Sequence, residues 1–243
     1  GSALVRILQV SDLHLTPGQA KKIEWVRSLA ALEPDFVVNS GDNLAHLEAV
    51  PPLLRAMEPL MDFPGAFVLG SNDYFAPTPK NPARYLTSGY ARAPRSRSDL
   101  PVGELVDGLR GGGWADLNNA RTVARMGDHD VELVGVDDPH VDRDRYGEVS
   151  AAARDDVSLT VGLVHAPYQR VLDAMVADGA SVVLAGHTHG GQLALPGWGA
   201  LVTNCDLDTR RAKGLSRWWP GAGTAGPRGR AARSSAAPED AAF

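Results

Sequence analysis

Ala185-Gly186-His187-Thr188-His189-Gly190-Gly191-Gln192 follows an apolar run, residues 181–184, that predicts a buried strand. The glycines leave the backbone open at a turn that presents two imidazoles. Because side chains of an extended segment alternate between two faces, we expect His187 and His189 to point the same way, toward one cluster of metal ions. In isolation, a polar surface loop explains the same residues. The chain repeats this pattern of apolar strand and polar turn elsewhere, which favours a site.

The composition is typical of one globular α/β domain. The chain has 243 residues, of which 44% are hydrophobic and 22% are charged, and its formal net charge is −5. This charge and the scattered lysines argue against an extended nucleic-acid partner and against a polybasic membrane-binding surface. Cys205 is the only cysteine, so an internal disulfide and a thiolate-rich zinc site are excluded. A metal site in this chain therefore has to use oxygen and imidazole ligands.

Three apolar runs in the first third of the chain predict strands that end in polar turns. The runs cover residues 4–10, 36–40 and 66–69, and the polar side chains that follow them are Asp12, His14, Asp42, Asn72 and Asp73. Asp12 and His14 together offer a carboxylate and an imidazole, which suit Mn, Fe or Zn; a helix N-cap at Ser11 or Asp12 is the alternative. Helical patterns over residues 21–32 and 46–61 connect the strands as βαβ units. The strand ends should therefore meet at one edge of a parallel sheet.

The second half of the chain repeats this arrangement. A β-branched run over residues 159–164 ends in His165, and a helical pattern over residues 167–177 leads on to the strand before the opening stretch. His140 follows another apolar run, residues 131–136, and is a candidate residue at the rim of the site. We expect the two halves to converge on one site.

A long segment, residues 75–101, is rich in Pro, Arg, Ser and Asn and has no clear periodicity. It is basic, with Lys80, Arg84, Arg92, Arg95 and Arg97. Contacts to an anionic substrate are one interpretation of these cations, and a solvated surface loop is the other.

In their order, these blocks resemble the motifs of the calcineurin-like metallophosphoesterase superfamily. The matching blocks are Asp12-x-His14, Gly41-Asp42, Gly70-Ser71-Asn72-Asp73, His165 and Gly186-His187-Thr188-His189. The resemblance implies a four-layer αββα sandwich with a dinuclear centre of two divalent or mixed-valence ions, Mn, Fe or Zn. The implied ligands are Asp12, His14 and His189 at the first ion, His165 and His187 at the second, and Asp42 as the bridge. In such a centre, a hydroxide held by both ions attacks phosphorus.

The third block departs from the family pattern. Aligned without a gap, Ser71 stands where the family has its Asn ligand, and Asn72 stands where it has a His that assists the leaving group. We treat Asn72 as a candidate ligand and, with Asp73, as a candidate catalytic residue. The missing imidazole should weaken leaving-group assistance by about 10²-fold. His46 or His140 is a possible substitute for it.

We expect a metallophosphoesterase domain over residues 3–218. Residues 219–243 turn to Gly, Ala, Pro, Arg and Ser, which predicts a disordered, atypical tail and an incomplete C-terminal sheet edge. The longest stretch without Asp, Glu, Lys or Arg, residues 179–205, holds histidines, glycines and a proline, so no membrane span is expected. The chain as given should be soluble and cytoplasmic by default. A natural parent tethered through an N-terminal hydrophobic segment is compatible with the resemblance, and the sequence does not indicate an oligomeric state.

The resulting hypothesis is metal-dependent hydrolysis of a small phosphorylated substrate, either a phosphomonoester or a phosphodiester. One alternative is a metal-binding module with weak or no catalysis, because the third block is altered. The other is a pyrophosphatase that acts on a nucleotide-linked lipid or sugar.

Overall fold

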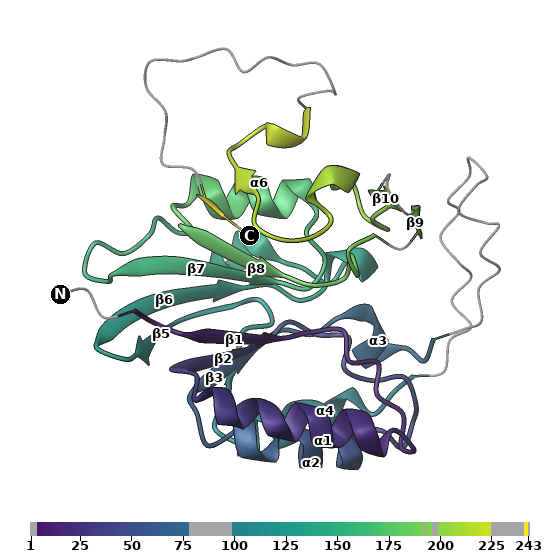
Figure 1. Ribbon diagram of the computed structural model, residues 1–243. Coiled ribbons are helices and arrows are strands. Elements are labelled where there is room, and N and C mark those ends of the chain that lie inside the picture. The colour runs from purple at the N-terminus through teal and green to yellow at the C-terminus, as the bar shows by residue number, and fades with distance from the viewer. Residues whose placement is uncertain (1–3, 78–98, 192, 196–198, 225–240, 243) are drawn as a thin grey trace.

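The computed structural model describes residues 4–77, 99–191, 193–195, 199–224 and 241–242. Within these residues the chain forms a four-stranded and a six-stranded sheet that face each other, with helices on the outer face of each (Figure 1). The expected αββα sandwich is therefore confirmed. A small antiparallel pair, β9 (Leu193–Leu195) and β10 (Gly199–Val202), lies beside the sandwich.

The first sheet is parallel throughout. Its strands are β1 (Ile7–Val10), β2 (Phe36–Asn39), β3 (Gly65–Phe67) and β4 (Ala115–Asp116). The helices that cover it are α1 (Ala20–Ser28), α2 (Val50–Met57) and α4 (Val102–Gly111). For residues 46–61, Pro51 and Pro52 predict a helix with a kinked or restarted first turn, and α2 indeed begins at Val50. Both prolines stand at its start, where a missing backbone N–H leaves no helical bond unmade.

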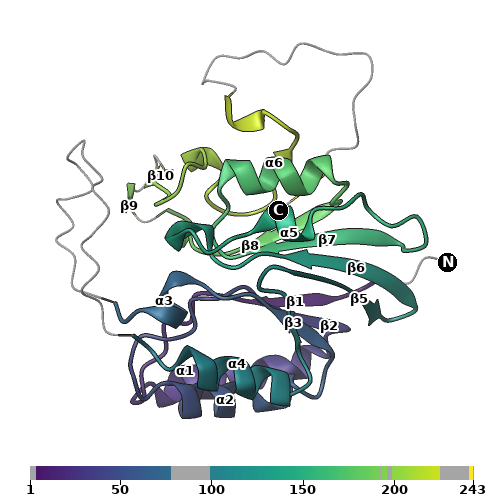
Figure 2. The same ribbon diagram turned by 180° about the vertical axis from the view of Figure 1, so that it is seen from behind.

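The second sheet has the order β11-β12-β8-β7-β6-β5. Its strands are β5 (Ala120–Met126), β6 (His129–Gly135), β7 (Leu159–Val164), β8 (Val182–Ala185), β11 (Arg217–Trp218) and β12 (Ala241–Ala242). Strands β5 and β6 form an antiparallel hairpin, whereas β6, β7 and β8 are parallel. Helices α5 (Tyr146–Val149) and α6 (Gln169–Ala177) lie on its outer side (Figure 2).

Three apolar layers hold the four structural layers together. Between α1, α2, α4 and the first sheet, the core includes Leu53 and Phe67. Between the two sheets it includes Phe36 and Leu133, and beneath α6 it includes Leu172. Both faces of each sheet are covered, which explains why the strands read as continuous apolar runs rather than as alternating ones.

The C-terminal edge of the second sheet consists of short strands. Strands β11 and β12 have two residues each, and β12 meets β8 through the single residue pair Ala242 and Val182. Trp218 is buried, and its indole N–H donates to Asp173 Oδ1 in α6 at 2.8 Å. Of the predicted tail, the structure describes only residues 219–224 and 241–242, so the division into domain and disordered tail stays a prediction.

The five basic residues of the segment 75–101 all lie outside the described residues. No helix within the described ranges is both long enough and apolar enough to span a bilayer.

Candidate metal centre

Six of the predicted side chains gather where strands of both sheets end. They form two groups in which the ligand atoms lie within 4.8 Å of one another. The first group is Asp12, His14 and His189, and the second is Asp42, His165 and His187. Asp12, His14 and Asp42 follow β1 and β2, whereas the other three follow β7 and β8. Each group therefore combines residues from both sheets.

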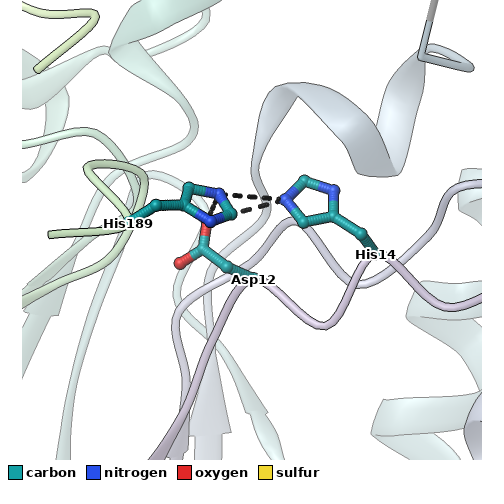
Figure 3. A group of neighbouring side chains, drawn as sticks. All are labelled: Asp12, His14 and His189. Carbon is teal, nitrogen blue, oxygen red and sulfur yellow. Dashed lines mark hydrogen bonds and ion pairs between the residues drawn. The ribbon is translucent and has the colours of Figure 1, made fainter. Parts of the chain in front are cut away.

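The first group, whose three side chains lie close together in Figure 3, is partly open to solvent. The Nε2 atoms of His14 and His189 are 3.1 Å apart, and His189 Nε2 lies 3.2 Å from Asp12 Oδ1. The two rings stack with their centroids 5.1 Å apart. One carboxylate oxygen and two imidazole nitrogens are thus close enough to bind a single ion.

The second group is buried. His165 Nε2 lies 3.3 Å from Asp42 Oδ2 and 3.3 Å from His187 Nδ1. Asp42 Oδ2 is also 3.8 Å from His14 Nε2, in the first group. One carboxylate oxygen therefore lies between the two groups, where a bridging ligand would stand.

The donor set fits metal ions. Two ligand nitrogens at about 2.1 Å from a tetrahedral ion are about 3.4 Å apart, close to the nitrogen–nitrogen separations of 3.1 and 3.3 Å in the two groups. Imidazole and carboxylate ligands suit Mn, Fe and Zn. The residues present are thus able to hold one ion in each group.

Backbone carbonyl groups orient two of the imidazoles. His165 Nδ1 lies 2.7 Å from the carbonyl oxygen of Ser40, and His187 Nε2 lies 3.3 Å from that of Asn204. A donated N–H at these positions leaves His165 Nε2 and His187 Nδ1 as the acceptors that face the site, which is the usual outer-shell arrangement of metal-ligating histidines. The sequence does not reveal these partners, because a backbone carbonyl carries no side-chain signature.

His187 and His189 do not lie on an extended segment as expected, although both imidazoles belong to the two adjoining ligand groups. His187 has φ 70° and His189 has φ 51°, both in the left-handed region, and the two imidazoles belong to different groups. Asp12, His14 and Asp42 also have positive φ. The alternation of side-chain directions along a strand does not apply to such a backbone. The direction of each side chain is therefore set by the local turn.

Burial and neighbouring charges shift the pKa values of these side chains. Although burial alone would raise the pKa of Asp42, the His165 and His14 imidazoles and the Asn72 N–H hold it well below its usual range. Burial, with His165 and His140 nearby, lowers the pKa of His187 to about 3. The carboxylate and the neutral imidazole are the forms that bind metal ions.

The third block places Asn72 against Asp42. The backbone N–H of Asn72 donates to Asp42 Oδ1 at 2.7 Å, and its side-chain amide lies 2.6 Å from Asp42 Oδ2. Ser71 is buried at the start of α3 (Ser71–Tyr74). Asn72, rather than Ser71, therefore lies next to the carboxylate between the two groups.

Asp73, the other candidate catalytic residue of the third block, is hydrogen-bonded to the backbone of the Asp42 turn. It is fully buried, and its Oδ2 accepts from the backbone N–H groups of Asp42 and Gly70 at 2.9 and 3.0 Å. Its Oδ1 accepts from the N–H of Asn43 at 2.8 Å. Both oxygens are engaged away from solvent, an arrangement that favours a role in positioning the Asp42 turn over a catalytic one.

His140, the candidate rim residue, lies next to the second group. Its ring centroid is 4.6 Å from that of His187, and its Nδ1 lies 3.0 Å from the Tyr168 hydroxyl. The backbone N–H of His140 donates to Asp138 Oδ1, a buried carboxylate that the sequence analysis did not single out. His46 is exposed, and its Nδ1 accepts from the backbone N–H of Glu48.

The comparisons with known proteins agree with the motifs. A family model described as calcineurin-like phosphoesterase matches residues 5–191. Two proteins of Bacillus subtilis (strain 168) are each 26% identical to this chain: the uncharacterized protein YpbG over 79% of the chain, and the uncharacterized metallophosphoesterase YkuE over 82%. The chain spans 64% of the length of YpbG and 63% of that of YkuE.

A similar solved structure is TT1561 of Thermus thermophilus, with a TM-score of 0.48 and 16% identity. The match covers 86% of this chain and 97% of TT1561. The family model spans more than half of the sequence and includes every residue of the two groups. The chain therefore belongs to the calcineurin-like phosphoesterase family, a family of metal-dependent phosphoester hydrolases.

Proposed function

We propose that this chain hydrolyses a phosphomonoester or a phosphodiester with a dinuclear metal centre built from the two groups. The observation that carries the proposal is the position of Asp42 Oδ2, which lies 3.3 Å from His165 Nε2 and 3.8 Å from His14 Nε2. A single carboxylate in reach of both groups is the ligand that a pair of closely spaced ions requires.

Some of these side chains would bind the metal ions, and others would orient the metal ligands. Asp12, His14 and His189 would hold one ion, His165 and His187 the other, with Asp42 between them. Asn72 is a candidate ligand beside Asp42, and its backbone N–H keeps that carboxylate in place. When bound, two such ions supply Lewis acidity toward the phosphoryl oxygens and a nucleophile at neutral pH.

Metal content and turnover test the proposal together. The protein is stripped with a chelator, reloaded with Mn²⁺, Fe²⁺ or Zn²⁺, and analysed for bound metal and for hydrolysis of an aryl phosphate and a bis-aryl phosphate. We expect two ions per chain and metal-dependent turnover. Asp42→Asn should lower both the metal content and the turnover, the latter by at least about 100-fold, since even outer-shell changes cost 10–100-fold.

Asp128→Asn is the matched control. Asp128 is 91% exposed in the turn of the β5–β6 hairpin, so the same loss of charge at this position should leave metal content and turnover unchanged. Turnover by the metal-free protein, or an Asp42→Asn variant as active as the control, would refute the proposal.

A second candidate is a metal-binding module with weak or no catalysis. The specific observation in its favour is that an amide, Asn72, lies beside Asp42 where the family resemblance places an imidazole. Two bound ions without turnover of either aryl substrate would support this candidate instead.

A further inference from the structure

A cavity of about 370 Å³ opens beside the first metal group. Asp12 and His189 line it on one side, and Arg211 and Lys213 line it on another. A volume of this size lies within the range of small-molecule sites. Because the cavity reaches the proposed metal ligands, a substrate whose phosphoryl group lies at the metal centre would extend into it.

The cationic segment is tied to the loop that carries the histidines. Thr188, which stands between His187 and His189, is 9% exposed, and its hydroxyl donates to the carbonyl oxygen of Ala212 at 2.7 Å. Asp208 accepts from the backbone N–H of Arg210 at 2.9 Å and so begins the helical turn Thr209–Arg211. The positions of Arg211 and Lys213 relative to His189 are therefore set by hydrogen bonds.

Arg211 is oriented by two aromatic rings. Its guanidinium carbon lies 5.0 Å from the centroid of the Trp218 ring and 5.5 Å from that of Trp219, and its Nη1 donates to the carbonyl oxygen of Arg217. Contacts of this kind hold a guanidinium without neutralising its charge. Trp218 itself is buried, which gives Arg211 a fixed support.

Lys213 reaches the cavity along the glycines that follow His189. Its Cδ lies 3.6 Å from the place that a Cβ on Gly190 would take. Across the described parts of the chain, no carboxylate oxygen lies within 4.0 Å of the charged atoms of Lys213 or Arg211, whereas the adjacent Arg210 is paired with Asp208 at 2.8 Å. Two cations that have no carboxylate oxygen within 4.0 Å among the described residues thus line a cavity next to a proposed phosphoryl site.

We propose that Lys213 and Arg211 hold a second phosphate group of the substrate, separate from the phosphate that is hydrolysed. This inference rests on the proposed function for the position of the scissile phosphate. Cations on a cavity wall select anionic groups, and phosphate is well matched to the donors of Lys and Arg. Pro167 and Leu207 also line the cavity, so the part of the substrate between its two phosphates contacts apolar surface.

The test uses two non-hydrolysable probes that differ in one group. Propylphosphonate carries a single phosphonate, and propane-1,3-diyl bisphosphonate carries a second one at the other end of the same chain. Calorimetric titration of the Mn²⁺-loaded protein should show that the bisphosphonate binds at least about tenfold more tightly, since one hydrogen-bonded charge pair is worth that much. Lys213→Ala combined with Arg211→Gln should bring the ratio of the two affinities close to one.

Single variants keep the test interpretable if the double variant is unstable. Lys213→Glu reverses one charge on an exposed side chain and should make the bisphosphonate the weaker ligand. Arg210→Ala, in the same turn but paired with Asp208 and outside the cavity lining, should keep the wild-type ratio. Equal affinities in the wild type, or an unchanged ratio in Lys213→Glu, overturn the second phosphate site.

Hydrolysis of an aryl phosphate by the wild type, measured in parallel, separates the two proposals. Turnover without a bisphosphonate preference leaves the phosphoesterase proposal standing and removes the second phosphate site. A preference that is lost in the variants, without turnover, supports the second site and counts against the hydrolase.

Discussion

At the scale of single residues, the metal centre is built on an unusual backbone. Among the residues that the structure describes, nine non-glycine residues have positive φ, and five of these are Asp12, His14, Asp42, His187 and His189. Each such residue costs about 1–3 kcal/mol and persists only where its surroundings define it. Those surroundings include Asp73, whose Oδ2 accepts a hydrogen bond from the backbone N–H of Asp42. They also include Asp12, whose Oδ2 lies 3.1 Å from the backbone nitrogen of His187.

Asp73→Asn tests the positioning role. The amide keeps one acceptor but places an NH₂ group against backbone N–H donors, so we expect the free energy of unfolding to fall by about 1–3 kcal/mol. Metal affinity should fall by about 10–100-fold, as for other outer-shell partners. Urea denaturation and metal titration measure the two effects.

Asp62→Asn is the control for this change, because Asp62 is exposed. It should alter the free energy of unfolding by less than about 0.5 kcal/mol. An Asp73→Asn protein as stable as Asp62→Asn would show that the three N–H bonds do not hold the Asp42 turn.

The rate of hydrolysis should depend more strongly on the leaving-group pKa here than at a site that has a proton donor. Asn72 donates no proton, so we expect alkyl phosphates to be hydrolysed about 100-fold less efficiently, relative to aryl phosphates, than a general acid would allow. The measurement is kcat/KM over a series of phosphate esters with rising leaving-group pKa. Asn72→His should flatten this dependence, whereas Asn72→Gln keeps an amide and should not. A flat dependence in the unmodified chain would contradict the prediction.

At the scale of elements, the strand ends need glycine for close approach. A Cβ on Gly70, between β3 and α3, would lie 2.7 Å from both Cδ2 and Nε2 of His165 and would also meet Asp42 Oδ1. A Cβ on Gly186, after β8, would lie 2.7 Å from Asp12 Oδ2. Contacts this short require a neighbour to move, so these glycines allow the ends of the two sheets to meet.

Gly70→Ala should therefore reduce metal binding more than it reduces the stability of the fold. We expect the bound metal to fall from two ions per chain toward one or none, because His165 and Asp42 have to shift; elemental analysis measures this content. Gly103→Ala is the matched control, since a Cβ on Gly103 in α4 meets nothing within 4 Å. That change should keep both ions and stabilise the helix by up to about 1 kcal/mol. A Gly70→Ala protein with full metal content would refute the argument.

At the scale of the whole molecule, the metal centre joins the two sheets. The first sheet supplies Asp12, His14 and Asp42, and the second supplies His165, His187 and His189. Bound ions would therefore act as cross-links between layers that otherwise hold together through the apolar contacts around Phe36 and Leu133. Metal binding and the stability of the sandwich should be coupled.

Removal of the metal should consequently lower the melting temperature. At a free metal concentration 100 times the dissociation constant, each bound ion adds about 2.7 kcal/mol, which corresponds to about 5–10 °C per ion for a chain of this size. Calorimetric scans with Mn²⁺ and with a chelator measure the shift. Asp42→Asn should show a much smaller shift, and a shift equal to that of the wild type would contradict the cross-linking role of Asp42.

The sequence alone indicated the main parallel strands and the order of the motifs, and it limited the types of metal ligand that are available. The β-branched run over residues 159–164 coincides with β7, because buried strands of a parallel sheet are apolar on both faces. The lone cysteine limited any metal site to oxygen and imidazole ligands. These conclusions depend on local composition and spacing, which a linear sequence contains.

Only the tertiary structure decided how the backbone orients each ligand and which partners support it. His187 and His189 are two positions apart, yet they join different groups because each has its own left-handed turn. The roles of Asp73, the Ser40 and Asn204 carbonyl groups and Lys213 depend on partners distant in the sequence. Backbone dihedral angles and contacts between the two sheets arise when the layers pack, so residue spacing does not encode them.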